Sequence, residues 1–199
     1  YSTCTALLNM TDELLSAKDK GWSGVLTSLD YSQAFDSVNF DMLLSKLRFL
    51  KFDDVSLRWF SSYLGGRSQV TKVNGRCSDE LCRNVGVPQG TCLGPILFQL
   101  YTFDLGKQTK FCSLHSYADD CQLICTFPSH NFGEAIDKIN VDLGKVKEWS
   151  DSHGLKLNPD KCLALPLYPS HARFTNNLNG KVILDGRCLP VSEIVSVLG

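Results

Sequence analysis

Two apolar runs joined by a short acidic tip constrain this chain more than any other feature of its 199 residues. The tip is Tyr117-Ala118-Asp119-Asp120. Apolar flanks around such a tip predict a β-hairpin with buried strands and an exposed turn. Aspartate is also a common turn former, so the tip alone fits a solvated corner as well as a site. A site requires further acids to converge on it.

A second candidate acid follows a predicted buried strand. The stretch Gly24–Asp30 is apolar and β-branched, and it brings Asp30 to its C-terminal end. If Asp30 met Asp119 and Asp120, carboxylates about 4 Å apart would repel by about 4 kcal/mol at an effective dielectric near 20. A divalent cation would remove that penalty, and Mg²⁺ suits carboxylates that also bind substrate phosphates. Two such ions about 3.5 to 4 Å apart favour nucleotidyl transfer.

The amino-acid composition is that of a globular protein domain. The chain is 43% hydrophobic and 21% charged, which is ordinary for a globular protein, and we expect one domain. No run of eighteen apolar residues and no charged-then-apolar leader occur, so neither a membrane span nor a secretory signal is expected. The first residue is Tyr1 rather than Met, which suggests a partial chain.

The cysteines and the net charge limit the kinds of metal and nucleic-acid binding that the sequence can support. Nine scattered cysteines without a C-x-x-C pair predict reduced thiols packed as small hydrophobes, not a thiol metal site. A net charge of -1 argues against coating nucleic acid by bulk charge. One segment nevertheless carries a local basic excess, with eight basic residues against four acids, and could form a phosphate-facing surface. The basic residues are Lys46, Arg48, Lys51, Arg58, Arg67, Lys72, Arg76 and Arg83.

The remaining elements follow from hydrophobic period and turn signals. Helices are expected over residues 3–18, 40–50, 54–65, 93–105 and 131–153, and further strands over 68–73, 81–85, 163–167 and 195–198. Asn74-Gly75 and Asp185-Gly186 predict hairpin turns. The loop Gly86–Thr91 allows close approach of a ligand and projects the amide of Gln89. We therefore predict an α+β fold with an antiparallel sheet and helices packed on one face.

Four segments in one order resemble the palm and fingers motifs of reverse transcriptases, most nearly those of non-LTR, LINE-type retrotransposons of jockey-like character. They are LDYSQAFDSV (Leu29–Val38), GVPQGTCLGP (Gly86–Pro95), YADD (Tyr117–Asp120) and GLKLNPDK (Gly154–Lys161). The resemblance implies a right-hand polymerase palm with partial fingers. It makes residues 1–199 a single reverse transcriptase domain fragment, incomplete at both ends, in which Val197–Gly199 looks like the start of the primer grip.

The resemblance also implies residue roles. Asp30, Asp119 and Asp120 would ligate two Mg²⁺ (or Mn²⁺) ions. Phe35 would exclude a 2′-hydroxyl and so select deoxynucleotides, and Lys161 would protonate the pyrophosphate leaving group. The residues expected to contact substrate are Tyr31, Phe35, Pro88, Gln89 and Gly90. Thr91 and Gly94 stand where relatives often carry serine.

The implied activity is that of an RNA-directed DNA polymerase of a mobile element, which extends a DNA primer on an RNA template from deoxynucleoside triphosphates. This 199-residue fragment by itself is expected to be weakly active or inactive. Its expected location is inside the cell, in the nucleus and in cytoplasmic ribonucleoprotein. The missing fingers, thumb and a possible endonuclease domain would belong to the parent polyprotein. Two alternatives stay open. One is a catalytically inactive palm remnant that binds RNA or protein, and the other is an RNA-dependent RNA polymerase, in which Asp36 would bind a 2′-hydroxyl.

Overall fold

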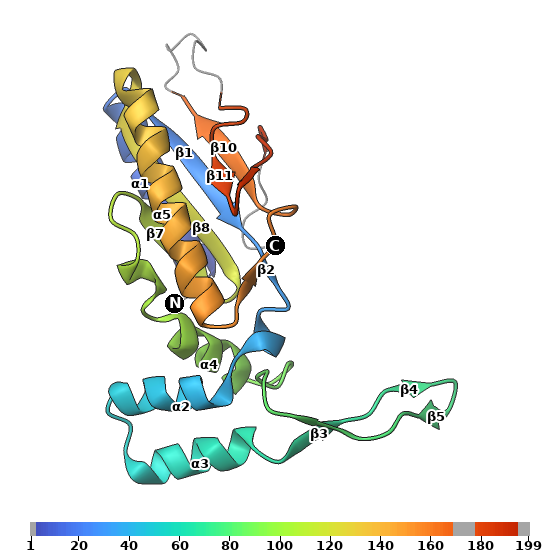
Figure 1. The fold of residues 1–199 in the computed structure, drawn as a ribbon. Helices are drawn as coiled ribbons and strands as arrows, with labels where there is room; N and C mark the ends of the chain where they lie inside the picture. The colour runs from blue at the N-terminus through green and yellow to red at the C-terminus, as the bar shows by residue number, and fades with distance from the viewer. Residues whose placement is uncertain (1–2, 169–177, 195–199) are drawn as a thin grey trace. The chain divides into compact units, whose positions relative to one another are not determined.

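The computed structural model describes residues 3–168 and 178–194, and the colours of Figure 1 follow them along the chain. These residues form two compact units. The first comprises the chain up to Ser32, residues 104–152 and the described residues from Lys156 onward, and the second comprises residues 33–103 and 153–155. The first unit holds the main sheet, and the second holds three helices and a long hairpin.

The first unit is built on a four-stranded antiparallel sheet in the order β10-β1-β8-β7. Its strands are β1 (Trp22–Leu29), β7 (Ser113–Tyr117), β8 (Asp120–Pro128) and β10 (Leu163–Leu167). The predicted acidic hairpin is confirmed as β7 and β8, which pair Tyr117 with Asp120 around a two-residue turn. Ala118 in that turn has a φ of 53°, the left-handed region that tight hairpin turns require.

Helices α1 (Thr3–Asp19) and α5 (Phe132–Ser152) cover this sheet (Figure 1). Met10 of α1 packs against Leu26 and Ile124, which are paired neighbours on one face. Phe132 of α5 packs edge-on against Phe127, with ring centroids 6.2 Å apart. Since successive residues of a strand point to opposite faces, Ile124 and Phe127 lie on different faces. The α+β antiparallel fold is confirmed, but its helices cover both faces instead of one, because residues of both alternating sets in β8 are buried: Gln122 and Ile124 on one face, Leu123 and Phe127 on the other.

A buried carboxylate fixes the start of β7 to α5. Asp142 of α5 is 1% exposed and accepts hydrogen bonds from the backbone N–H groups of Lys110, Phe111 and Cys112 at 2.8 to 3.0 Å. Three backbone donors satisfy the carboxylate and offset much of the cost of burying it. The hairpin that carries the acidic tip is thereby anchored at its other end.

Two short strand pairs and two 3₁₀ turns complete the described part of the first unit. Strand β2 (Tyr31–Ser32) pairs with β9 (Lys156–Leu157), and β11 (Ile183–Leu184) pairs with β12 (Arg187–Cys188) around the predicted Asp185-Gly186 turn. Two 3₁₀ turns, η2 (Leu105–Lys107) and η3 (Ser129–Asn131), lie before β7 and α5. The expected strand over 195–198 and the primer-grip resemblance at 197–199 lie outside the described residues.

The second unit begins with the 3₁₀ turn η1 (Phe35–Ser37), followed by helices α2 (Phe40–Phe49) and α3 (Asp54–Leu64). Asn39 caps α2 by accepting from the N–H of Met42, and Asp53 caps α3 by accepting from the N–H groups of Val55 and Ser56. The predicted hairpin follows as two strand pairs, β3 (Arg67–Gln69) with β6 (Leu81–Arg83) and β4 (Lys72–Val73) with β5 (Arg76–Cys77). Asn74 and Gly75 form its turn with positive φ angles.

Helix α4 (Leu93–Thr102) is shorter than predicted. It ends at Thr102 rather than at 105 because Asp104 leaves the helical region, with φ -99° and ψ 0°. None of the helices that the structure describes is both long and apolar enough to cross a bilayer. All nine cysteines are free; four are buried as predicted, whereas Cys4, Cys77, Cys82, Cys92 and Cys188 are exposed.

Candidate active site

The sheet register brings acids from two strands together. Leu29 at the end of β1 pairs with Cys121 of β8. Asp30 directly follows Leu29 and Asp120 directly precedes Cys121, so the two carboxylates extend from adjacent strands at one end of the sheet. Asp119 occupies the turn next to Asp120. The convergence of Asp30 with the acidic tip, expected from the sequence, is present in the structure.

The main chain of Asp30 is held by the loop that leads into β10. Its carbonyl accepts from the N–H of Asn158 at 2.9 Å, and its N–H donates to the Sγ of Cys162 at 3.3 Å. Cys162 is fully buried, and burial raises the pKa of its thiol. Sequence reasoning missed this supporting role, because a buried thiol 132 residues away in the chain carries no local signal.

One oxygen of Asp30 is buried without a hydrogen bond. Among the described residues no donor reaches its Oδ1, and Lys161 Nζ stands 3.8 Å away in an ion pair. The Lys161 side chain is 67% exposed, so water screens this pair and its contribution to stability is small. A buried carboxylate oxygen with no donor costs free energy unless a cation satisfies it.

The electrostatics of the cluster favour a bound cation. Partial burial, followed by the negative charges of Asp119 and Asp30, raises the pKa of Asp120. Within residues 3–168 and 178–194, no three His, Cys, Asp or Glu side chains form a ready-made metal cage. Mg²⁺ does not require one, because it binds through one or two carboxylates and completes its shell with water and substrate phosphates. The donor set therefore fits Mg²⁺ better than a metal that needs an all-protein cage.

Tyr31, expected to contact substrate, has a side chain that faces the core. The residue is 7% exposed, and its hydroxyl lies 3.0 Å from the Oγ of Ser150 in α5. Burial is also the main reason that the pKa of Tyr31 is raised. Because the side chain of Tyr31 is buried, only its main chain is available to contact substrate.

Four of the expected substrate-contacting residues lie in the second unit. The half-buried ring of Phe35 packs against Phe98 of α4, with ring centroids 4.9 Å apart. The loop Pro88–Gly90 precedes α4, and its Gly90 has a φ of 73°. Thr91 Oγ1 donates to the carbonyl of Pro88 at 2.8 Å and accepts from the N–H of Gly94 at 3.1 Å, which closes the loop on the helix.

Gly94 itself is required by this loop. A Cβ at this position would lie 2.9 Å from the carbonyl oxygen of Pro88. Such contacts essentially never occur in real structures, so the backbone of the loop could not approach α4 this closely with any larger residue. Both positions at which relatives often carry serine thus have local roles here.

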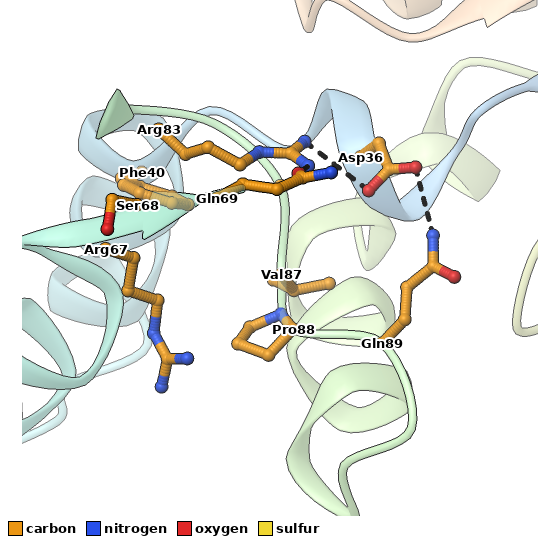
Figure 2. A pocket seen from close by; sticks show the side chains of 10 residues that line it. Asp36, Phe40, Arg67, Ser68, Gln69, Arg83, Val87, Pro88 and Gln89 are labelled. Atoms are coloured by element: carbon orange, nitrogen blue, oxygen red, sulfur yellow. Dashed lines mark hydrogen bonds and ion pairs between the residues drawn. The ribbon is translucent and has the colours of Figure 1, made fainter. Parts of the chain in front are cut away.

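A pocket of about 600 Å³ lies in the second unit, where the end of the hairpin meets the loop (Figure 2). Asp36, Arg67, Arg83, Pro88 and Gln89 are among its lining residues. Asp36 Oδ1 forms an ion pair with Arg83 Nη2 at 3.4 Å, and Gln89 Nε2 donates to Asp36 Oδ2 at 3.0 Å. Figure 2 shows Arg83 and Gln89 reaching the same carboxylate from different sides.

The predicted phosphate-facing basic surface is smaller than the sequence suggests. Lys46 is 9% exposed, and its Nζ donates to the carbonyl of Tyr101 at 2.6 Å. Arg83 is engaged by Asp36. The other six basic residues of that segment are exposed. Counting charges along the sequence could not separate the buried Lys46 and the paired Arg83 from their exposed neighbours.

An antiparallel sheet that presents paired acids from a central strand and a neighbouring hairpin defines a nucleotidyltransferase palm. The chain matches the family "Reverse transcriptase (RNA-dependent DNA polymerase)" over residues 4–179, and it belongs to that family. Polymerases of this family use divalent metal ions. The match is to RNA-dependent DNA polymerases and gives no support to the RNA-dependent RNA polymerase alternative.

Curated relatives are mobile-element polymerases. The chain is 31% identical over 170 residues to the "Probable RNA-directed DNA polymerase from transposon BS" of Drosophila melanogaster, an alignment that covers 82% of this chain and 18% of that protein. It is 29% identical over 202 residues to the "RNA-directed DNA polymerase from mobile element jockey" of Drosophila funebris, covering 97% of this chain and 21% of that protein. The chain thus spans about a fifth of the length of these relatives.

Solved structures share the fold. An apo telomerase from Candida tropicalis, truncated from its C-terminal domain, superposes with a TM-score of 0.62 at 17% identity and covers 88% of this chain and 36% of that chain. A Candida tropicalis telomerase in complex with a fragment of telomeric RNA gives a TM-score of 0.57 at 16% identity, covering 89% of this chain and 31% of that chain. At this identity the likeness establishes the polymerase palm and fingers fold alone.

Proposed function

We propose that this chain is the catalytic core of an RNA-directed DNA polymerase encoded by a non-LTR mobile element. The observation that carries the proposal is the meeting of Asp30 and Asp120 across β1 and β8, with Asp119 in the adjoining turn. Palm sheets occur in proteins of many functions, but three acids at one strand end have no role in packing. They suit the transfer of a nucleotidyl group.

Asp30, Asp119 and Asp120 would hold two Mg²⁺ or Mn²⁺ ions. The unsatisfied oxygen of Asp30 and the mutual repulsion of the acids support this assignment. Bound as a pair, such ions supply charge stabilisation at both the attacking and the leaving oxygen of an in-line displacement. The protein contributes the position of the carboxylates, which the sheet register and the bonds to the main chain of Asp30 keep rigid.

The remaining roles are assigned residue by residue. Lys161 would give a proton to the departing pyrophosphate, since its exposed ammonium is adjacent to Asp30. The ring of Phe35 would lie under the sugar and exclude a 2′-hydroxyl by shape, supported by its packing on Phe98. Gln89, Gly90 and Pro88 would contact the incoming nucleotide and the template. Tyr31 would contribute main-chain contacts alone.

The partners we infer are an RNA template, a DNA primer and deoxynucleoside triphosphates. The telomerase in complex with an RNA fragment supports RNA binding by this fold. We infer action in the nucleus and in cytoplasmic ribonucleoprotein.

A palm that binds RNA or protein without catalysis is the second candidate. The chain retains all three acids, which favours the polymerase. An RNA-dependent RNA polymerase would need the second acid, Asp36, to accept from a 2′-hydroxyl. Both oxygens of Asp36 already have partners in Arg83 and Gln89, which counts against that use.

Primer extension by the polymerase that contains this chain tests the proposal. Asp119→Asn should lower extension of an oligo-dT primer on poly-rA by several orders of magnitude while the protein stays folded, because a carboxamide binds Mg²⁺ poorly. Asp137→Asn, an exposed acid on α5, is the matched control and should leave extension unchanged. Normal extension by a folded Asp119→Asn protein would reject the assignment, and loss in both variants would point to a general defect.

A further inference from the structure

The backbone of the turn η1 is fastened to the segment that leads into the Gln89 loop. The N–H of Gly86 donates to the carbonyl of Val38 at 2.8 Å, and the N–H of Val87 donates to the carbonyl of Phe35 at 2.9 Å. Gly86 has a φ of 92°, and a Cβ there would lie 2.9 Å from the carbonyl oxygen of Asp36. The close approach depends on glycine, and it fixes Asp36 against the loop.

The carboxylate of Asp36 also bonds to two side chains, Arg83 and Gln89, that lie on either side of Gly86 and Val87 in the chain. Its Oδ1 pairs with Arg83 Nη2 at 3.4 Å, and its Oδ2 accepts from Gln89 Nε2 at 3.0 Å. Arg83 is itself oriented by the hairpin, since its Nη1 donates to Gln69 Oε1 at 2.7 Å. Each oxygen of Asp36 therefore has one partner, as the dashed lines in Figure 2 show.

This arrangement fixes which end of the Gln89 amide faces away from the protein. A carboxylate only accepts hydrogen bonds, whereas an amide has one end that donates and one that accepts. Gln89 must therefore turn its NH₂ group toward Asp36, and Figure 2 shows its oxygen pointing away. The sequence allowed the exposed amide both to donate and to accept toward a ligand. In the structure, the atom of the Gln89 amide that faces away from the protein is the oxygen, which can only accept a hydrogen bond.

We propose that Asp36 is a positioning residue for substrate: it orients Gln89 so that the amide oxygen accepts a hydrogen bond from the incoming nucleotide. This inference rests on the proposed function, in which Gln89 contacts the nucleotide. In this scheme Asp36 acts on substrate through Gln89, since its Oδ2 accepts from that amide and its Oδ1 pairs with Arg83. The scheme requires the side chain at position 36 to accept a hydrogen bond from Gln89. A side chain of the same volume that donates a hydrogen bond instead would not orient Gln89 in the same way.

The competing explanation is purely structural, with Asp36 and Arg83 forming an ion pair that joins the hairpin to η1. Their side chains are 33% and 32% exposed, so solvent weakens such a pair. A structural role would be sensitive to loss of the charge at Asp36 and indifferent to the chemistry at Gln89. The two explanations therefore differ in how substitutions at the two positions combine.

A donor–acceptor swap separates them. In Asp36→Asn the new NH₂ group would face Gln89 and reverse its amide, which presents a donor to the nucleotide. In Gln89→Glu two carboxylates would face each other. In the double variant, the amide introduced at position 36 can donate to the carboxylate introduced at position 89 and still accept from Arg83. The second oxygen of the new carboxylate then faces outward, and the net charge of the pair is the same as in the wild type.

We would measure kcat and KM for deoxythymidine triphosphate with the polymerase that contains this chain, on oligo-dT and poly-rA. Each single variant should raise KM about tenfold, the scale of one charge-assisted hydrogen bond, with a smaller change in kcat. The double variant should return to within about threefold of the wild-type KM. Asp41→Asn, an exposed acid in the first turn of α2, is the matched control and should keep the wild-type KM.

Additive losses in a folded double variant would overturn the inference, as would a wild-type KM in Asp36→Asn. A change confined to the KM for primer-template would also overturn it, because the effect would then not concern the nucleotide. The Asp119→Asn variant serves as the independent check. If that variant extends primers normally, the proposed polymerase site has failed; if it is inactive and the swap shows no rescue, only the role of Asp36 has failed.

Discussion

Asp30 and Asp120 extend from adjacent antiparallel strands, one step beyond the paired residues Leu29 and Cys121. The register of β1 and β8 therefore sets their separation, and no flexible loop intervenes. Two like charges held by a rigid sheet repel each other in the absence of a cation, because the backbone cannot relax to part them. The site stores an unfavourable interaction that a bound metal would relieve.

Metal binding should consequently be visible in stability as well as in activity. In EDTA, Asp120→Asn should raise the free energy of unfolding by about 0.5 kcal/mol, a small gain because the side chain is largely exposed. Added Mg²⁺ should raise the melting temperature of the wild type and change that of Asp120→Asn less. Thermal unfolding of both proteins in EDTA and at increasing concentrations of Mg²⁺ measures this.

The control for that experiment is Asp12→Asn, an exposed acid on α1. It should respond to Mg²⁺ as the wild type does. If Mg²⁺ left the wild-type melting temperature unchanged at every concentration, or if Asp120→Asn were the less stable protein in EDTA, the acids would not form the repelling cluster described here.

The features of the fold that could be predicted from the sequence are those that depend on a few neighbouring residues. Asn39 and Asp53 mark helix starts by capping, and the Asn74-Gly75 turn marks a hairpin, because these depend on a few neighbouring residues. The acidic site was also predictable, since acids at strand ends have no packing purpose. Its geometry depended on pairing between β1 and β8, which sequence suggests but does not specify.

What the sequence did not reveal depends on contacts between distant segments. Tyr31 was expected at the substrate, but its hydroxyl meets Ser150 of α5. Lys46 and Arg83 were counted as part of a basic surface, yet each has an inward partner. The second helical layer was missed for the same reason, because an apolar strand does not say whether one or both of its faces are covered.

A side-chain contact between α1 and β7 predicts that the stability of the protein depends on pH. His115 Nε2 donates to Glu13 Oε2 at 2.8 Å. Burial acts to raise the pKa of Glu13, but hydrogen bonds to His115 and Ser113 outweigh it, so the pKa lies below its ordinary value of 4.5. A lowered carboxyl pKa contributes stability that is present above pH 4.5 and is lost as the pH falls through the folded-state pKa.

Glu13→Gln should therefore lower the free energy of unfolding at pH 7 by up to about 1 kcal/mol, because the pair is only partly buried. The difference from the wild type should shrink as the pH falls below 4.5. Urea unfolding at pH 7, 5 and 3.5 measures it, with Asp12→Asn as a control on the same helix. A difference that stays constant across this range would show that Glu13 contributes by packing alone.

Two glycines should respond oppositely to alanine. Gly86 has a φ of 92°, and a Cβ would lie 2.8 to 3.0 Å from Arg83 and Asp36. Gly144 lies exposed within α5, and a Cβ added there would point into open space. Gly86→Ala should destabilise the protein by more than about 1 kcal/mol, and Gly144→Ala should stabilise it by about 1 kcal/mol.

Urea unfolding midpoints of the two variants test this contrast. The same substitution is made in both, so differences in the unfolded chain largely cancel. A Gly86→Ala protein as stable as the wild type would show that η1 and the Gln89 loop can separate at little cost. The positioning of Gln89 by Asp36 would then lose its rigid basis.

Sugar selection should depend on the shape of Phe35. Its ring packs at 4.9 Å on Phe98, which is 1% exposed and cannot move away, so a 2′-hydroxyl on a sugar above the ring would clash with a side chain that cannot shift. Phe35→Ala should raise incorporation of ribonucleotide relative to deoxynucleotide by about tenfold or more, the scale of discrimination by one small group in a tight pocket. Single-nucleotide extension with each triphosphate measures the ratio.

Asp36→Ala separates shape from hydrogen bonding in that experiment. It should weaken binding of both nucleotides without changing their ratio, because Asp36 bonds Arg83 and Gln89 and acts on either nucleotide through Gln89. Phe49→Ala, which removes a ring that is 68% exposed, is the control for loss of an aromatic side chain. If Asp36→Ala shifted the ratio and Phe35→Ala did not, sugar choice would rest on a hydrogen bond, as in the RNA polymerase alternative.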